Sequence, residues 1–137
     1  MVGYTALNAK NLSDEEVSQW QQVGIEKKWI GNWQSSGVKT ADEAKKWIDA
    51  GEQHYGVRNW KRIGVNDPIE VEKWKKLKFN TSNVSEFIQA KVTPDTLKEW
   101  MKSGIRKKEA LIYHKANIRN LEDAKRWKKA GVTTVRD

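Results

Sequence analysis

The stretch Glu122–Gly131 reads EDAKRWKKAG, and the stretch Asp42–Gly51 reads DEAKKWIDAG. Both stretches place a Trp four residues before a Gly and an Ala three residues before that Trp. Two nearly identical phrases so far apart in one chain indicate an internal repeat, and the Trp is the residue on which the whole chain can be aligned.

Aligned in this way, the chain carries an aromatic anchor nine times, at spacings of 13 or 14 residues. An apolar side chain precedes each anchor by three residues, and six of the nine anchors are followed by Gly four residues later. A period this regular over nine copies is not a chance pattern. The anchors are Trp20, Trp33, Trp47, Trp60, Trp74, Phe87, Trp100, Tyr113 and Trp127.

Each repeat has the pattern of one short amphipathic helix, because apolar residues three apart lie on the same helix face. The Gly suits the left-handed position that ends a helix, and the aliphatic residue that usually follows it can fold back onto the last turn. Lys78, Lys91 and Asn117 replace this Gly in three repeats. The two Lys residues lack the conformational freedom of Gly, so their caps are expected to be weaker or strained by about 1 kcal/mol.

Residues that cap helix N-termini well stand seven positions before alternate anchors, which pairs the helices into units of about 27 residues. These predicted N-caps are Ser13, Thr40, Asp67, Thr93 and Asn120. The intervening helices have Glu26, Gln53, Asn80 and Arg106 at this position, and only Asn80 is a favourable cap. The repeat unit is therefore predicted to be a pair of helices, present four and a half times.

Helices of about ten residues do not persist alone in water, so they are expected to stack on their neighbours. The fold predicted is all-α, an α-solenoid of about nine short helices in 27-residue two-helix repeats, with a compact helical bundle as the alternative. One domain is expected, with an N-terminal lead-in at 1–12, repeats at 13–132 and a tail at 133–137. The signatures of tetratricopeptide, ankyrin and HEAT repeats are not found.

The composition of the chain argues against a disulfide-bonded, thiolate-metal or membrane-spanning protein. The 137 residues include no Cys, which excludes disulfides and thiolate metal sites, and no apolar run is long enough to span a membrane. The start of the chain lacks the pattern of a signal peptide, so a cytoplasmic location is expected. The formal charge of +8 is uneven, since residues 1–65 carry +1 and residues 66–137 carry +7. An anionic partner would be attracted to the second half.

Eight Trp residues raise the question of whether aromatic rings serve binding or packing. The anchor rings share the period of the apolar and Gly columns, which favours core packing over stacking on a ligand. Trp29 differs, because it lies outside the anchor column and next to Lys27 and Lys28. Core packing is still the favoured role for Trp29, and it is the candidate exposed aromatic residue among those in the chain.

Basic residues recur two positions before or after the anchors, roughly opposite the aromatic rings. Stacking would bring them into a ridge over residues 58–129 that suits nucleic acid. The alternative explanation is the helix dipole, which favours bases near helix ends without any ligand. The candidate ridge residues are Arg58, Arg62, Lys76, Lys98, Lys102, Lys115, Lys125 and Lys129.

Motifs that carry catalysis are not found, and the two His residues, His54 and His114, lie in different repeats without metal-ligand spacing. The expectation is a protein without catalytic residues, cofactor, metal or membrane segment. Its function is expected to be that of a helical-repeat scaffold that binds a protein partner, and the alternative is a nucleic-acid-binding protein that uses the basic ridge. An open array takes its function from surface residues, so the identity of the partner does not follow from the fold.

Overall fold

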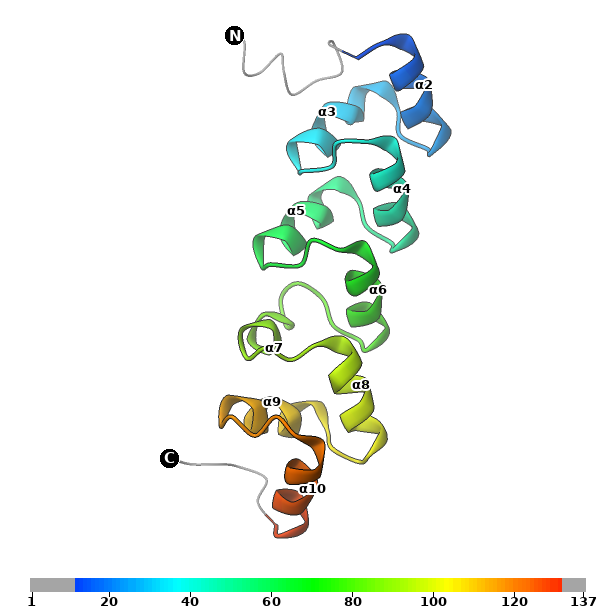
Figure 1. The fold of residues 1–137 in the computed structure, drawn as a ribbon. Helices are drawn as coiled ribbons and strands as arrows, with labels where there is room; N and C mark the ends of the chain where they lie inside the picture. Colours follow the sequence, from blue (N-terminus) through cyan, green and yellow to red (C-terminus); the bar gives the residue numbers. More distant parts are fainter. Residues whose placement is uncertain (1–11, 132–137) are drawn as a thin grey trace. The chain divides into compact units, whose positions relative to one another are not determined.

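A computed structural model describes residues 12–131, and within this range the chain forms nine α-helices and no strand (Figure 1). The all-α prediction is therefore confirmed. The helices are α2 (Asp14–Gln22), α3 (Lys27–Ser35), α4 (Ala41–Asp49), α5 (His54–Arg62), α6 (Pro68–Lys76), α7 (Ser85–Gln89), α8 (Pro94–Lys102), α9 (Lys107–Lys115) and α10 (Leu121–Lys129). Apart from Leu12, the predicted lead-in lies outside the described residues, and so does the predicted tail.

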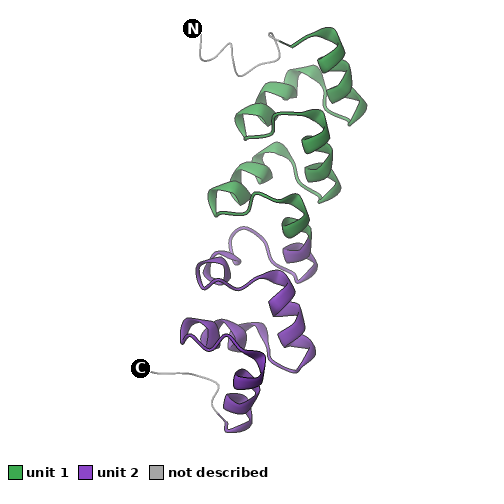
Figure 2. Ribbon diagram, in the orientation of Figure 1, with its two compact units in different colours: residues 1–72 green, residues 73–137 purple. Residues whose placement is uncertain are grey.

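The chain divides into two compact units, residues 1–72 (unit 1) and residues 73–137 (unit 2), shown in separate colours in Figure 2. In unit 1, α2 packs against α3 and α4, and α3 packs against α5. In unit 2, α8 packs against α9. Helices thus contact the next helix and the next but one, as expected for stacked pairs. A single solenoid over the whole chain, and its alternative of a compact bundle, stay predictions.

The C-terminal ends of the helices share one backbone conformation. The residue in the Gly column has a positive φ in every repeat, including Lys78 (70°), Lys91 (66°) and Asn117 (65°). The backbone N–H of the next residue donates to the carbonyl of the anchor, as Ile25 does to Trp20 (3.1 Å). This bond defines a Schellman motif and recurs after the first eight anchors. For Trp127 the partner would be Val132, which lies outside the described residues.

The five residues predicted as N-caps all accept hydrogen bonds from the first turns of their helices. Ser13 and Glu16 form a reciprocal capping box, and Thr40 accepts from the backbone N–H of Glu43 at 3.2 Å. Asp67 and Asn120 each accept from the backbone N–H two residues later at 2.9 Å. Each such bond satisfies a donor that the helix itself cannot pair. Thr93 caps α8 in the same way as Thr40 caps α4.

The prediction that Asn80 caps a helix is wrong. Its side chain instead accepts the backbone N–H groups of Ser82 (2.9 Å) and Asn83 (3.2 Å), which closes a turn. Helix α7 begins only at Ser85 and has five residues. Asn side chains offer such local bonds as an alternative to helix, and here the turn has replaced the first part of the expected helix.

The core consists of the columns that the sequence alignment identified. The first eight anchors and all nine apolar residues three positions before an anchor are buried. Trp127 departs from the expected burial, with 43% of its surface exposed. Its helix, α10, is the last helix in the described part of the chain, so no later helix there covers the ring.

Candidate functional site

The eight predicted ridge residues are all exposed. Arg58 and Arg62 lie on α5 in unit 1, and the other six belong to unit 2. Those six are carried by four helices, with Lys115 on α9 and the rest on even-numbered helices: Lys76 on α6, Lys98 and Lys102 on α8, Lys125 and Lys129 on α10.

The boundary between the units separates charge more sharply than a division at residue 65. Unit 1 contains nine Lys and Arg against eleven Asp and Glu, which gives −2. Unit 2 contains seventeen against seven, which gives +10. The positive field that could attract a polyanion is therefore a property of unit 2.

Equivalent helix positions in the two units differ in charge. On α4, Lys45 forms an ion pair with Asp49 at 2.9 Å, whereas on α8 the same two positions hold Lys98 and Lys102. Like charges four residues apart destabilise a helix slightly, so packing does not account for this pair. We call Lys98, Lys102 and their equivalents on α10 the cationic face; the equivalents are Lys125 and Lys129.

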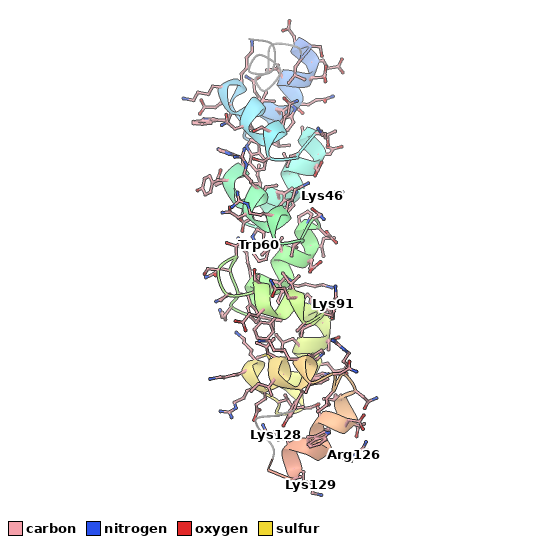
Figure 3. The ribbon with its side chains drawn as sticks, turned by 90° about the vertical axis from the view of Figure 1, so that its left-hand side faces the viewer. Lys46, Trp60, Lys91, Arg126, Lys128 and Lys129 are labelled. Atoms are coloured by element: carbon pink, nitrogen blue, oxygen red, sulfur yellow. The ribbon has the colours of Figure 1, made fainter. Side chains whose placement is uncertain are left out.

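Other bases have structural roles. Lys61 Nζ donates to the carbonyl of Gly37 at 3.1 Å, and Lys128 Nζ donates to that of Gly104. Arg119 Nη1 donates to the carbonyl of Ala90 at 2.8 Å. Such bonds satisfy carbonyls at helix C-termini, where the dipole also favours a cation. In Figure 3, Lys128 extends toward α9, whereas Lys129 at the end of the same helix points away from the ribbon.

Glu109 is the most strongly perturbed ionisable group in the described part of the chain. Its side chain is only 4% exposed, and its oxygens accept from the backbone N–H of Arg106 at 2.9 Å and from Lys128 Nζ at 2.9 Å. The backbone hydrogen bond from Arg106, followed by those from the Lys128 and Arg106 side chains, lowers the pKa of Glu109 to about 2. These partners satisfy a buried carboxylate that joins α9 to α10, which is a structural role.

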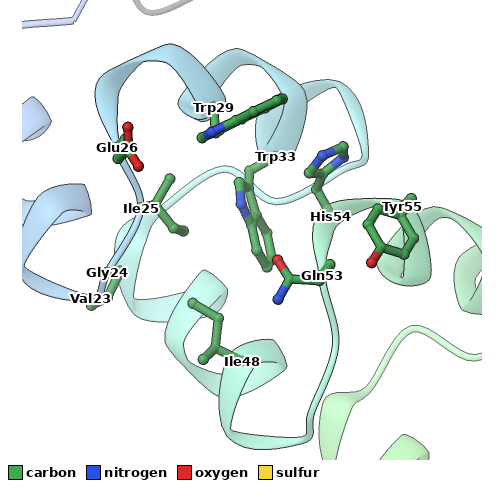
Figure 4. A pocket seen from close by; sticks show the side chains of 10 residues that line it. All are labelled: Val23, Gly24, Ile25, Glu26, Trp29, Trp33, Ile48, Gln53, His54 and Tyr55. Carbon is green, nitrogen blue, oxygen red and sulfur yellow. The ribbon is translucent and has the colours of Figure 1, made fainter.

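A pocket of about 500 Å³ opens in unit 1 (Figure 4). We call it the aromatic pocket, because four of the residues that line it carry aromatic rings. Its walls come from the turn after α2, from α3 and from the start of α5, with one residue from α4. The lining residues are Val23, Gly24, Ile25, Glu26, Trp29, Trp33, Ile48, Gln53, His54 and Tyr55.

Four rings define one side of the aromatic pocket. Trp29, which is 44% exposed, stacks on His54 with 5.9 Å between ring centroids and 21° between planes. His54 also meets Trp33 edge-on at 6.3 Å and Tyr55 at 5.4 Å. Burial, with a smaller contribution from the nearby Arg58 charge, lowers the pKa of His54. With its pKa below the ordinary value of 6.5, the His54 ring is mostly uncharged at pH 7 and can pack among the other rings.

Polar groups in the aromatic pocket are mostly unpaired donors. Trp29 Nε1, the Gln53 amide and the Tyr55 hydroxyl have no hydrogen-bond partner among residues 12–131, and neither does Trp33 Nε1. Trp33 as a whole is only 3% exposed. Its Nε1 atom is nevertheless not fully buried, because the only fully buried side-chain polar atom without a partner in residues 12–131 is Trp47 Nε1. The Trp33 nitrogen therefore keeps some exposed surface, and its residue is one of those that line the pocket. In Figure 4, the nitrogens of both Trp rings lie toward Ile25 and Glu26.

Sequence reasoning singled out Trp29 but missed its partners in the pocket. His54 and Tyr55 come from the next pair of helices and belong to no repeating column. The sequence did hold one indication of Tyr55. Apart from the anchors and Phe79, which follows the Gly-column residue Lys78, the aromatic residues of the chain are Tyr4, Trp29 and Tyr55. Tyr4 lies outside the described residues.

Within residues 12–131 no group of three or more His, Cys, Asp or Glu is placed to hold a metal ion. In the same range, no helix combines the length and the apolar character needed to cross a bilayer. Comparisons of the chain with models of protein families, with curated proteins and with solved structures find no match. The two surfaces from which a function can be inferred are the cationic face and the aromatic pocket.

Proposed function

We propose that this protein is a non-enzymatic helical-repeat binding module, and that its ligand is a segment of another protein held in the aromatic pocket of unit 1. The observation that carries the proposal is the combination of exposed Trp29 and Tyr55 with donors that have no partner. Exposed Trp and Tyr are the residues most enriched where proteins contribute binding energy. A concave site with few polar groups among apolar walls is also the usual form of a ligand site.

The site has the dimensions and chemistry of a peptide site. Its volume of about 500 Å³ falls within the range of known ligand pockets. Helix α3 and the first turn of α5 hold the rings on rigid elements, and Schellman motifs fix the C-terminal ends of both helices. A preformed site of this kind loses little conformational entropy when it binds.

Selection from a displayed library of random peptides tests the proposal. We expect the full-length chain to enrich peptides whose binding is lost in Trp29→Ala. The matched control is Trp127→Ala, because Trp127 is 43% exposed and lies on α10, outside the pocket. Absence of any enriched peptide, or equal loss of binding in both variants, would contradict the proposal.

A second candidate function is nucleic-acid binding through unit 2. The observation that favours it is the cationic face, since three of its members, Lys98, Lys102 and Lys129, have no ion-pair partner among residues 12–131. With a surplus of ten positive charges, unit 2 would attract a polyanion at long range.

Salt-dependent titration with labelled duplex DNA tests this candidate. Replacing the three unpaired lysines with Gln is expected to flatten the slope of log affinity against log salt by about two to three, because each phosphate contact contributes about 0.9. Melting should change little, since exposed charges contribute little to stability. The matched control replaces three exposed lysines of unit 1, Lys27, Lys39 and Lys46, and should leave the slope unchanged. Equal slopes in both variants would contradict binding at the cationic face.

A further inference from the structure

We infer that the aromatic pocket binds a proline-rich segment in the polyproline II conformation. This inference rests on the proposed function, because it accepts that the partner is a protein and specifies the class of segment. It is carried by the ring surfaces, the unpaired donors and the charge of the pocket.

The ring surfaces provide ridged apolar walls at the mouth of the pocket. Trp29 lies nearly parallel to His54, whereas Tyr55 meets His54 at 82° and is 63% exposed. Proline-rich segments dock in grooves lined by aromatic rings, and their conformation is already formed before binding. The exposed rings of Trp29 and Tyr55 therefore offer packing surfaces for successive pyrrolidine rings.

The donors match what a proline-rich segment lacks. Proline has no backbone N–H, and a polyproline II segment has no internal hydrogen bonds, so its carbonyls are free acceptors. The pocket presents the indole N–H groups of Trp29 and Trp33 and the hydroxyl of Tyr55, none of which has a partner in the described part of the chain. Trp33 is the most telling member, because its nitrogen sits on a ring that is otherwise buried. A carbonyl placed there would satisfy a donor that the fold leaves unused.

Charge in the pocket favours an uncharged ligand. Glu26, the only acid in the lining, forms an ion pair with Lys28 at 3.8 Å. The Lys28 ammonium also lies 5.6 Å from the Trp29 ring centre, so a cation of the protein itself already stands beside this ring. A nucleic acid could stack on the rings, but unit 1 carries more acids than bases and Glu26 stands at the rim. A neutral peptide segment fits this balance best.

Titration of the full-length chain with fluorescein-labelled decaproline, followed by anisotropy, tests the inference. We expect saturable binding that Trp29→Ala and Tyr55→Ala each weaken about tenfold or more, since exposed rings at a binding centre contribute most of its energy. Trp127→Ala is the matched control and should bind as the unchanged chain does. Trp33→Phe keeps a ring in the core but removes the N–H, and should weaken binding about two- to tenfold.

The outcomes separate this inference from the proposed function. If library peptides bind through Trp29 but decaproline does not, the inference is wrong and the proposed function stands. If neither binds, both are wrong. Stronger binding of a labelled oligothymidine than of decaproline, with loss in Trp29→Ala, would assign the pocket to nucleic acid and overturn the inference. Unchanged affinity in a folded Trp33→Phe variant would refute the role of the donors.

Discussion

Replacing Lys91 by Gly is predicted to stabilise the protein, which is unusual for the removal of a side chain. Lys91 has φ of 66° at the end of α7, in the position that Gly occupies in six other repeats. A residue with a Cβ loses roughly 1–2 kcal/mol in this conformation. Removing this strain with Gly stabilises the folded state, but Gly also raises the entropy of the unfolded chain, which offsets roughly 0.5–1 kcal/mol of the stabilisation. The net stabilisation expected is about 0.5–1 kcal/mol.

The reverse substitution in the same unit is Gly104→Ala. Gly104 has φ of 91°, and a Cβ added there would have no heavy atom within 4 Å, so the change adds backbone strain without a clash. We expect a loss of about 1 kcal/mol. The control is Lys91→Ala, which keeps the Cβ and should leave the stability nearly unchanged.

Urea denaturation at neutral pH measures these changes. With a slope of about 1–3 kcal/mol per M, Lys91→Gly should raise the midpoint by about 0.2–1 M and Gly104→Ala should lower it by a similar amount. A lower midpoint for Lys91→Gly, with an unchanged slope, would refute the argument that the Gly column exists because of the left-handed backbone.

Three further predictions concern a core ring, a buried carboxylate and a lysine that binds a carbonyl at a helix end. Trp74→Ala should cost about 3–5 kcal/mol, because the ring is fully buried, and thermal melts should show a much smaller loss for the exposed Trp29→Ala. Glu109→Gln should cost about 3 kcal/mol at pH 7. The folded pKa of Glu109 lies below its ordinary value of 4.5, so this stabilisation is present above pH 5 and is lost as the pH falls toward 2. Denaturation should therefore show that the free energies of unfolding of Glu109→Gln and of the unchanged protein converge near pH 2. Lys61→Met should cost about 1–2 kcal/mol by leaving the Gly37 carbonyl without its donor, and equal denaturation midpoints would contradict that role.

The helix ends were predictable from the sequence because they depend on local geometry. The position four residues after the anchor has a positive φ even where Lys78 or Asn117 replaces Gly, so the repeat and not the residue type decides the backbone there. The side chains at the predicted N-caps, such as Ser13 and Thr40, also act over three residues. Asn80 was the exception, because its side chain can close a turn as easily as it can cap a helix.

The aromatic pocket could be predicted only in part, because it depends on contacts between neighbouring pairs of helices. Trp29 was identified by its position outside the anchor column, but its distance in space from His54 follows from the packing of α3 against α5. The exposure of Trp127 likewise depends on which helices cover α10. For the basic residues, the spacing of two positions from the anchors selected an exposed set that leaves out Lys61 and Lys128. It gave no sign that these two lysines bind carbonyls at helix ends, because those carbonyls lie more than 20 residues away in the chain.

The central claim is that Trp29 and Trp33 form a binding site, whereas the other buried Trp residues serve only to hold the fold together. Fluorine NMR of the full-length chain labelled with 5-fluorotryptophan tests it in one titration with a peptide selected from the random library. Trp29→Phe and Trp33→Phe assign the two pocket resonances. The account predicts that these two resonances shift with peptide concentration and that the resonance of Trp127 does not. Saturable peptide binding that moves the Trp127 resonance, and leaves those of Trp29 and Trp33 in place, would contradict it.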